Sequence, residues 1–171
     1  MHLNNYDSII RTADRIVDRL GTRDADLIAA GLGITIFEIP FKKQKGAYKV
    51  IERNPYIFLK DDLPPVMRSI VILHEVGHDR LHRKQASQFQ EFNLFDMSGS
   101  RMEYEANLFA AQIMLPDDEM IEYIHQGCSA DQIAAMMKSD INLVALKAAD
   151  LSRRGYAFRP QDYSGRFLIE K

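Results

Sequence analysis

Cysteine is scarce in this sequence and long apolar runs are missing, and each of these two features excludes a class of protein. The 171 residues include one cysteine, Cys128, and no tryptophan. One cysteine cannot form an internal disulfide, which excludes disulfide-stapled secreted folds and favours a reducing compartment, the cytoplasm. No apolar run approaches the roughly 20 residues of a membrane span, and the first residues lack the basic and apolar regions of a signal peptide.

An excess of charge of one sign is also missing. The chain carries 22 basic and 24 acidic residues, a formal net charge of -2. This balance gives no positive field that would attract nucleic acid or an anionic membrane surface. With 46% hydrophobic residues, the composition suits one compact domain with a small appended subdomain, which we expect at 1–118 and 119–171.

Periodicity and turn residues predict an α+β fold. Strands are expected over 34–39, 47–51 and 56–59, as a small, mostly antiparallel sheet of three strands. The stretch 87–100 is expected to form a loop or a short mobile helix, and the tail 156–171 to be irregular or extended. Helical spacing of apolar residues predicts seven helices, over 6–20, 24–30, 66–84, 101–115, 117–125, 130–138 and 143–154.

The most informative motif lies in the helix predicted over 66–84. His74 and His78 stand four residues apart, and Glu75 directly follows the first of them. Residues four apart on a helix share a face, so both imidazoles can reach one metal ion. Zinc hydrolases use this HExxH pattern, in which the glutamate is the general base. The motif therefore predicts zinc ligands at 74 and 78, whereas the plainer alternative is a core helix whose histidines only hydrogen-bond.

A catalytic zinc site needs a third protein ligand and one open position. The helix predicted over 101–115 offers two glutamates, Glu103 and Glu105. Glu103 shares a face with Asn107, whereas Glu105 is followed one turn later by Phe109. Spacing favours Glu103 as the third ligand, with Asn107 orienting a ligand histidine, but leaves Glu105 as an alternative. The glutamate that is not a ligand would be a solvated helix charge.

Three further side chains are candidates for supporting roles. His82 lies four residues beyond His78, but a straight helix drifts by about 40° over that distance and cannot easily aim three histidines at one ion. We expect His82 to hold a ligand or face the substrate, with simple core packing as the alternative. An oxyanion donor is also needed, and Tyr48, His82 and Tyr104 are equal candidates.

The segment 129–154 has a weak helix-turn-helix pattern. A DNA reader carries basic residues on its second helix. Here that helix offers Lys147, with Arg153 and Arg154 only at its end, and Asp140 and Asp150 offset them. We interpret the segment as a packing or partner-docking module, and direct nucleic-acid binding is not expected.

Taken together, the motifs resemble the ImmA/IrrE family of zinc metallopeptidases. The matching elements are the apolar run into the HExxH motif, Leu81-His82, and Glu103-x-x-x-Asn107 running on to Pro116. The resemblance implies a zincin-like core, Zn²⁺ bound by His74, His78 and Glu103, and Glu75 as base. Asn107 falls where gluzincin-type sites keep an Asp or Asn. One departure is Ile113-Met-Leu-Pro116 in place of Leu-Leu-Met-Pro, a volume-conserving change.

The resemblance also implies a role. Such proteins act as cytoplasmic antirepressors of phages, mobile elements or stress regulons, and are associated with cleavage or removal of a helix-turn-helix repressor. We therefore expect a zinc endopeptidase whose partner is a protein substrate of that kind. Two alternatives stay open: a binding module that sequesters a regulatory protein without hydrolysis, and a hydrolase that acts on another small amide.

Overall fold

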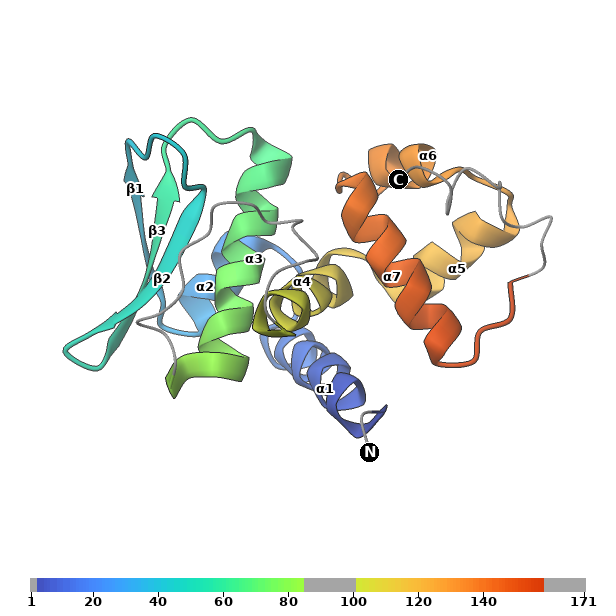
Figure 1. Ribbon diagram of the computed structural model, residues 1–171, viewed down its shortest axis with the longest axis horizontal. Helices are drawn as coiled ribbons and strands as arrows, with labels where there is room; N and C mark the ends of the chain where they lie inside the picture. The colour runs from blue at the N-terminus through green and yellow to red at the C-terminus, as the bar shows by residue number, and fades with distance from the viewer. Residues whose placement is uncertain (1–2, 85–100, 159–171) are drawn as a thin grey trace. The chain divides into compact units, whose positions relative to one another are not determined.

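The computed structural model describes residues 3–84 and 101–158 (Figure 1). The chain divides into two compact units, Met1–Ile113 and Met114–Lys171, whereas the division expected from the sequence falls after 118. The expected loop at 87–100 and most of the expected irregular tail lie outside the described residues. Among the residues that are described, no helix has both the length and the apolar character needed to cross a lipid bilayer.

The first unit is α+β, as predicted. Its described elements are α1 (Leu3–Leu20), α2 (Ala25–Gly31), β1 (Thr35–Ile39), β2 (Gly46–Ile51), β3 (Asn54–Lys60), α3 (Pro65–His82) and α4 (Arg101–Met114). Each lies within a few residues of its predicted range. The Asp24 side chain accepts a hydrogen bond from the Leu27 amide and so begins α2 as an N-cap.

The three strands form a mixed sheet in the order β1-β3-β2, which corrects the expectation of a mostly antiparallel one. β2 and β3 are the predicted antiparallel hairpin, and Glu52 and Arg53 at its turn have φ of 49° and 70°, as a primed two-residue turn requires. β1, however, pairs with β3 in parallel. Residues 40–45 connect β1 to β2 and reverse the direction of the chain. This connection leaves room for one strand between β1 and β2, and β3 fills that place.

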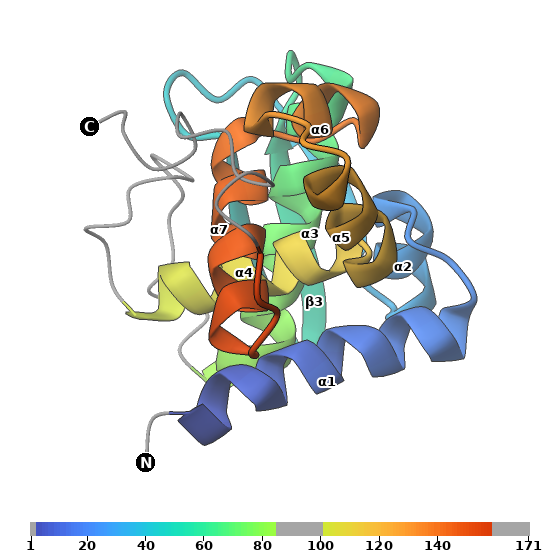
Figure 2. The same ribbon diagram turned by 90° about the vertical axis from the view of Figure 1, so that its right-hand side faces the viewer.

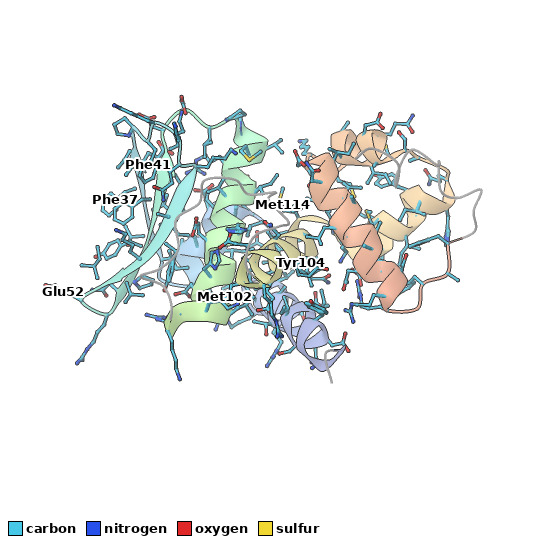
Figure 3. The ribbon with its side chains drawn as sticks, in the orientation of Figure 1. Phe37, Phe41, Glu52, Met102, Tyr104 and Met114 are labelled. Carbon is cyan, nitrogen blue, oxygen red and sulfur yellow. The ribbon has the colours of Figure 1, made fainter. Side chains whose placement is uncertain are left out.

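The two faces of the sheet differ. Tyr48, Ile57 and Leu59 are fully buried on the face that contacts α3. The other face carries Phe37, which is 49% exposed and stacks on Phe58 with ring centroids 6.0 Å apart. Figure 3 shows Phe37 and Phe41 on the side of the sheet away from α3. The inner face therefore provides one wall for α3.

Helices provide the other walls, so α3 is buried on every side from Ile70 to Asp79. A helix enclosed in this way is apolar all round, which explains the apolar run that precedes His74. α1 runs across the carboxyl-terminal end of α3 (Figure 2). Asp14 of α1 accepts a hydrogen bond from Gln112 at 2.8 Å, which ties α1 to α4. The polar residues of α3 therefore lie in the interior of the unit.

The second unit, taken by itself, contains three described helices: α5 (Asp117–His125), α6 (Ala130–Met136) and α7 (Ile141–Arg153). Ser129 and Asp140 are the N-caps of α6 and α7, since Ser129 forms a reciprocal capping box with Gln132 and Asp140 accepts from the Asn142 amide. α6 ends two residues before its predicted limit, and α7 begins two residues earlier than predicted.

Candidate metal centre

The candidate centre begins with α3, which positions His74, Glu75 and His78. Pro65 opens this helix at a position where the missing amide hydrogen costs nothing. All three side chains have no solvent exposure. His74 and His78 are one turn apart, and their Nε2 atoms are separated by 3.0 Å. The helix therefore brings both imidazoles to one point inside the protein.

A close crossing with α4 adds the third group. A Cβ at Gly77 would lie 3.1 Å from Cα of Ala106 and 3.3 Å from its carbonyl oxygen, so the two helix backbones touch at this point. Only glycine leaves room for that approach. Glu103 lies one turn before Ala106 on α4, and the crossing brings its carboxylate over the histidine pair.

The three side chains converge closely. Glu103 Oε2 lies 3.2 Å from His74 Nε2, and Oε1 lies 3.4 Å from His78 Nε2. Their ligand atoms all fall within 4.8 Å of one another, which makes them a group able to hold a metal ion. A tetrahedral zinc ion with bonds of about 2.0–2.1 Å separates its ligands by roughly 3.3–3.4 Å. The spacing of these atoms therefore fits zinc.

The position of the proton on the His74 ring also fits a metal site. Its Nδ1 lies 2.8 Å from the side-chain oxygen of Asn107, which can only accept a hydrogen bond. The proton therefore sits on Nδ1, and Nε2 presents its lone pair toward Glu103. An imidazole that binds metal through one nitrogen normally donates from the other in this way. Asn107 thus contacts His74, the first histidine of the motif.

His82 and Glu105 lie behind the centre. His82 Nδ1 is 3.3 Å from His78 Nδ1, and His82 Nε2 is 2.8 Å from Glu105 Oε2. Burial lowers the pKa of His82, against the opposing influence of Glu105. Burial raises the pKa of Glu105, but hydrogen bonds from His82 and Arg101 outweigh it and the pKa falls below its usual value. A neutral imidazole thus meets an ionised carboxylate.

Glu105 corrects the expectation that the glutamate outside the ligand set is a solvated charge. The residue is only 7% exposed and contacts His82 on the neighbouring helix. The spacing of Arg101 and Glu105, four residues apart on one helix, was a local signal for their ion pair. The contact with His82 joins two helices that are distant in sequence, so spacing alone could not reveal it.

Gly46, the first residue of β2, packs directly against Glu75. A Cβ at this position would lie 3.0 Å from Glu75 Oε1 and 2.4 Å from Cγ1 of Val71. Because Val71 is fully buried, it cannot move aside. Glycine is thus required where the strand begins, and the strand backbone runs beside the predicted base. Nothing in the motif spacing singles out Gly46.

Tyr48 ties the sheet to the end of α3. Its buried hydroxyl donates to the Asp79 carboxylate, which also pairs with Arg80. Burial raises the pKa of Tyr48, and Asp79 raises it further, so the hydroxyl keeps its proton. Because this hydroxyl is directed at Asp79 and His82 contacts His78, neither contact favours an oxyanion role for these two residues. Tyr104 stays a candidate, with its ring edge-on to Tyr6 at 5.5 Å.

The chain is similar in sequence to known proteins. The family model of the IrrE N-terminal-like domain matches residues 29–148. "Uncharacterized immunity region protein 2" of Bacillus phage phi105 is 32% identical over 151 residues, which are 86% of this chain and 92% of that protein. "Metallopeptidase ImmA" of Bacillus subtilis (strain 168) is 39% identical over 71 residues, which are 40% of this chain and 41% of that protein.

The matched range contains α3 and α4 entirely, and with them every residue of the candidate centre. A metallopeptidase family implies a metal cofactor and a protein substrate, and the donor set of His74, His78 and Glu103 suits such a cofactor. This chain therefore belongs to the ImmA/IrrE family of metallopeptidases.

Proposed function

We propose that this protein is a zinc-dependent endopeptidase that cleaves a helix-turn-helix repressor of a phage or mobile element in the cytoplasm. The observation that carries the proposal is the approach of Glu103 to the His74–His78 pair at 3.2 and 3.4 Å, with Glu75 buried on the same helix. The names of the two relatives, a metallopeptidase and an immunity region protein, support a role in phage immunity.

In this proposal the first unit is a zincin-like core of the gluzincin type. His74, His78 and Glu103 would hold the zinc ion, and Asn107 would fix the ring of His74. A bound zinc ion supplies Lewis acidity to water and to the scissile carbonyl. Glu75 takes one proton from the attacking water as the new C–O bond forms. It then delivers that proton to the leaving amine as the C–N bond breaks.

In this proposal the substrate backbone binds along the edge of β2 that lies next to Glu75. Among the described residues β2 pairs only with β3, so its other edge offers backbone donors and acceptors. An extended peptide can bind such an edge through main-chain hydrogen bonds. Gly46 starts this strand against Glu75, and a peptide along the edge would therefore pass the base.

The test is co-expression with a helix-turn-helix repressor encoded beside this gene, combined with metal analysis. The wild type should yield repressor fragments and bind one zinc ion per chain. Glu75→Gln should keep the zinc and slow cleavage by about 10²- to 10⁴-fold, because the proton acceptor is removed. Glu119→Gln makes the same chemical change at an exposed residue of α5 and should cleave like the wild type.

Two results would contradict the proposal. Cleavage by Glu75→Gln at the wild-type rate with zinc retained would remove the base assignment. An intact, stable complex between the zinc-loaded wild type and the repressor would indicate instead a module that sequesters its partner without hydrolysis.

A further inference from the structure

A chain of polar contacts leads from His78 to the surface through two helices. His78 Nδ1 lies 3.3 Å from His82 Nδ1, and His82 Nε2 lies 2.8 Å from Glu105 Oε2. Arg101 then donates to Glu105 Oε1 over 2.7 Å. His78 is fully buried and His82 and Glu105 nearly so, whereas Arg101 is exposed. The contacts thus form a continuous path with one end in the candidate centre.

The chemistry of these groups gives the path a direction. A carboxylate only accepts hydrogen bonds, so the proton between His82 and Glu105 belongs to His82 Nε2. A neutral imidazole has one donor and one acceptor, which makes His82 Nδ1 the acceptor. His78 Nδ1 must then be the donor in its contact with His82. Its lone pair consequently resides on Nε2, the nitrogen that faces Glu103 at 3.4 Å.

The two histidines of the centre are held in different ways. His74 donates directly to the neutral amide of Asn107. His78 contacts the second imidazole of His82 through Nδ1, and His82 in turn contacts the anionic Glu105, so two successive hydrogen bonds act on its orientation. Both Asn107 and Glu105 come from α4, the helix that also carries Glu103. α4 thereby supplies Glu103 and also positions His74 and His78.

We propose that His82 and Glu105 are positioning residues, which hold His78 with its Nε2 lone pair directed at the metal position. The inference rests on the proposed zinc site and extends it, because it assigns a role to a glutamate that is not a ligand. His82 acts on the metal only through His78, and Glu105 acts only through His82.

The contacts from His78 through His82 to Glu105 are called the relay below. Measurements of zinc affinity test the relay without any substrate. His82→Leu removes the acceptor while keeping similar volume, and zinc affinity should fall about 10- to 100-fold, as for other residues that orient ligands. His82→Gln offers an amide acceptor and donor and should recover part of that loss. Glu105→Gln keeps an acceptor but not the charge, and we expect a loss of roughly 3- to 10-fold. Competition with a chromophoric chelator at fixed pH measures each value.

Cobalt substitution supplies a second readout. The visible absorption of bound Co²⁺ reports the geometry of its ligands, so it should change in His82→Leu and return toward the wild-type spectrum in His82→Gln. Gln112→Leu is the matched control, because Gln112 is a buried polar residue of α4 that contacts Asp14 and not the centre. Because Gln112→Leu removes the hydrogen bond to Asp14 of α1, this control should lose thermal stability yet keep the zinc affinity and the cobalt spectrum of the wild type.

The outcomes separate the relay from the zinc site itself. If the wild type binds zinc and the His82 and Glu105 variants bind it equally well, the relay is wrong while the proposed peptidase stands. If the wild type binds no zinc, the proposed function fails and the relay fails with it. Should His82→Leu not fold, His82→Gln and Glu105→Gln decide the question, since both keep hydrogen-bonding groups in place.

Discussion

Each unit of the molecule buries a cluster of ionisable side chains, but the two clusters are balanced differently. In the second unit, the fully buried Lys147 pairs with Asp117. Arg154 forms two ion pairs, one with Asp117 at 2.6 Å and one with Asp150 at 2.8 Å. Cations and carboxylates alternate there. In the first unit, the ring nitrogens of His74 and His78 and the carboxylate oxygens of Glu103 face one another.

Under the proposed function, this difference separates a structural cluster from a metal site. Buried charges persist when each has an opposite partner, and the cluster of the second unit meets that condition within the chain. In the proposed zinc site, the three converging side chains would be stabilised by the bound cation. The comparison also bears on DNA binding. Lys147, the basic residue expected on the second helix of a DNA reader, is buried against Asp117 and cannot reach a phosphate.

The largest expected effect comes from removing the metal. A strong chelator should abolish peptide hydrolysis and increase hydrogen exchange in α3 and α4, while exchange in α5 and α7 stays unchanged. A ligand present at about 1,000 times its Kd adds about 4 kcal/mol to the stability of the state that binds it. Hydrogen-exchange mass spectrometry with and without chelator measures this. An equal change in both units, or none in either, would break the distinction between the clusters.

A loss of stability in the second unit is expected from Lys147→Met, which leaves the partly buried Asp117 with Arg154 as its remaining partner in the cluster. Breaking a fully buried pair from one side costs about 3–5 kcal/mol, and because Asp117 is partly exposed and keeps Arg154, the expected loss is about 3 kcal/mol or less. Zinc affinity should be unaffected. The double variant Lys147→Met with Asp117→Asn should be less damaged than the single variant, because neither charge is then left behind. Urea unfolding followed by circular dichroism, together with zinc titration, provides the comparison.

Sequence could predict those parts of the fold and the site that depend on local spacing. The helix ranges, the N-caps Ser129 and Asp140, and the shared face of Glu103 and Asn107 all follow from a period of 3.6 residues or from capping chemistry. The parallel pairing of β1 with β3 could not be predicted, because it depends on the path of a loop. The contact of His82 with Glu105 likewise depends on how α3 crosses α4.

Acid should affect the charge-balanced cluster. Burial raises the pKa of Asp117, but hydrogen bonds from Arg154 and Lys147 lower it to about 2, against 3.8 ordinarily. A depressed pKa stabilises the fold above the ordinary value, and this stability is lost as the pH falls from about 4 through 2. The shift corresponds to about 2 kcal/mol.

Urea unfolding of the metal-free chain at a series of acidic pH values measures the loss. Asp117→Asn should be less stable at pH 5 and should flatten the pH dependence between 4 and 2. Asp118→Asn, the same change at an exposed neighbour, should leave that dependence as in the wild type. An unchanged slope in Asp117→Asn would mean that the cluster is not held together by this carboxylate.

The smallest effect is expected where the helices of the candidate centre touch. Gly77→Ala places a Cβ 3.1 Å from Cα of Ala106, so the backbones must separate slightly. Overpacking costs about 1–3 kcal/mol, and the higher helix propensity of alanine returns about 0.5–1 kcal/mol, which leaves a net loss of about 1 kcal/mol. Zinc affinity should fall as well, because α4 carries Glu103.

Gly31 provides the control for Gly77, because a Cβ there meets a side chain and not a backbone. At Gly31 a Cβ would meet only the flexible side chain of Leu20, so Gly31→Ala should cost less and leave zinc affinity unchanged. Ala106→Gly should not rescue Gly77→Ala, since the obstructing atoms belong to the backbone of Ala106. Thermal unfolding and zinc competition on Gly77→Ala, Gly31→Ala and the double variant of Gly77→Ala with Ala106→Gly decide the matter. A Gly77→Ala protein that is more stable than the wild type, with full zinc affinity, would mean that the crossing is looser than described and does not set the position of Glu103.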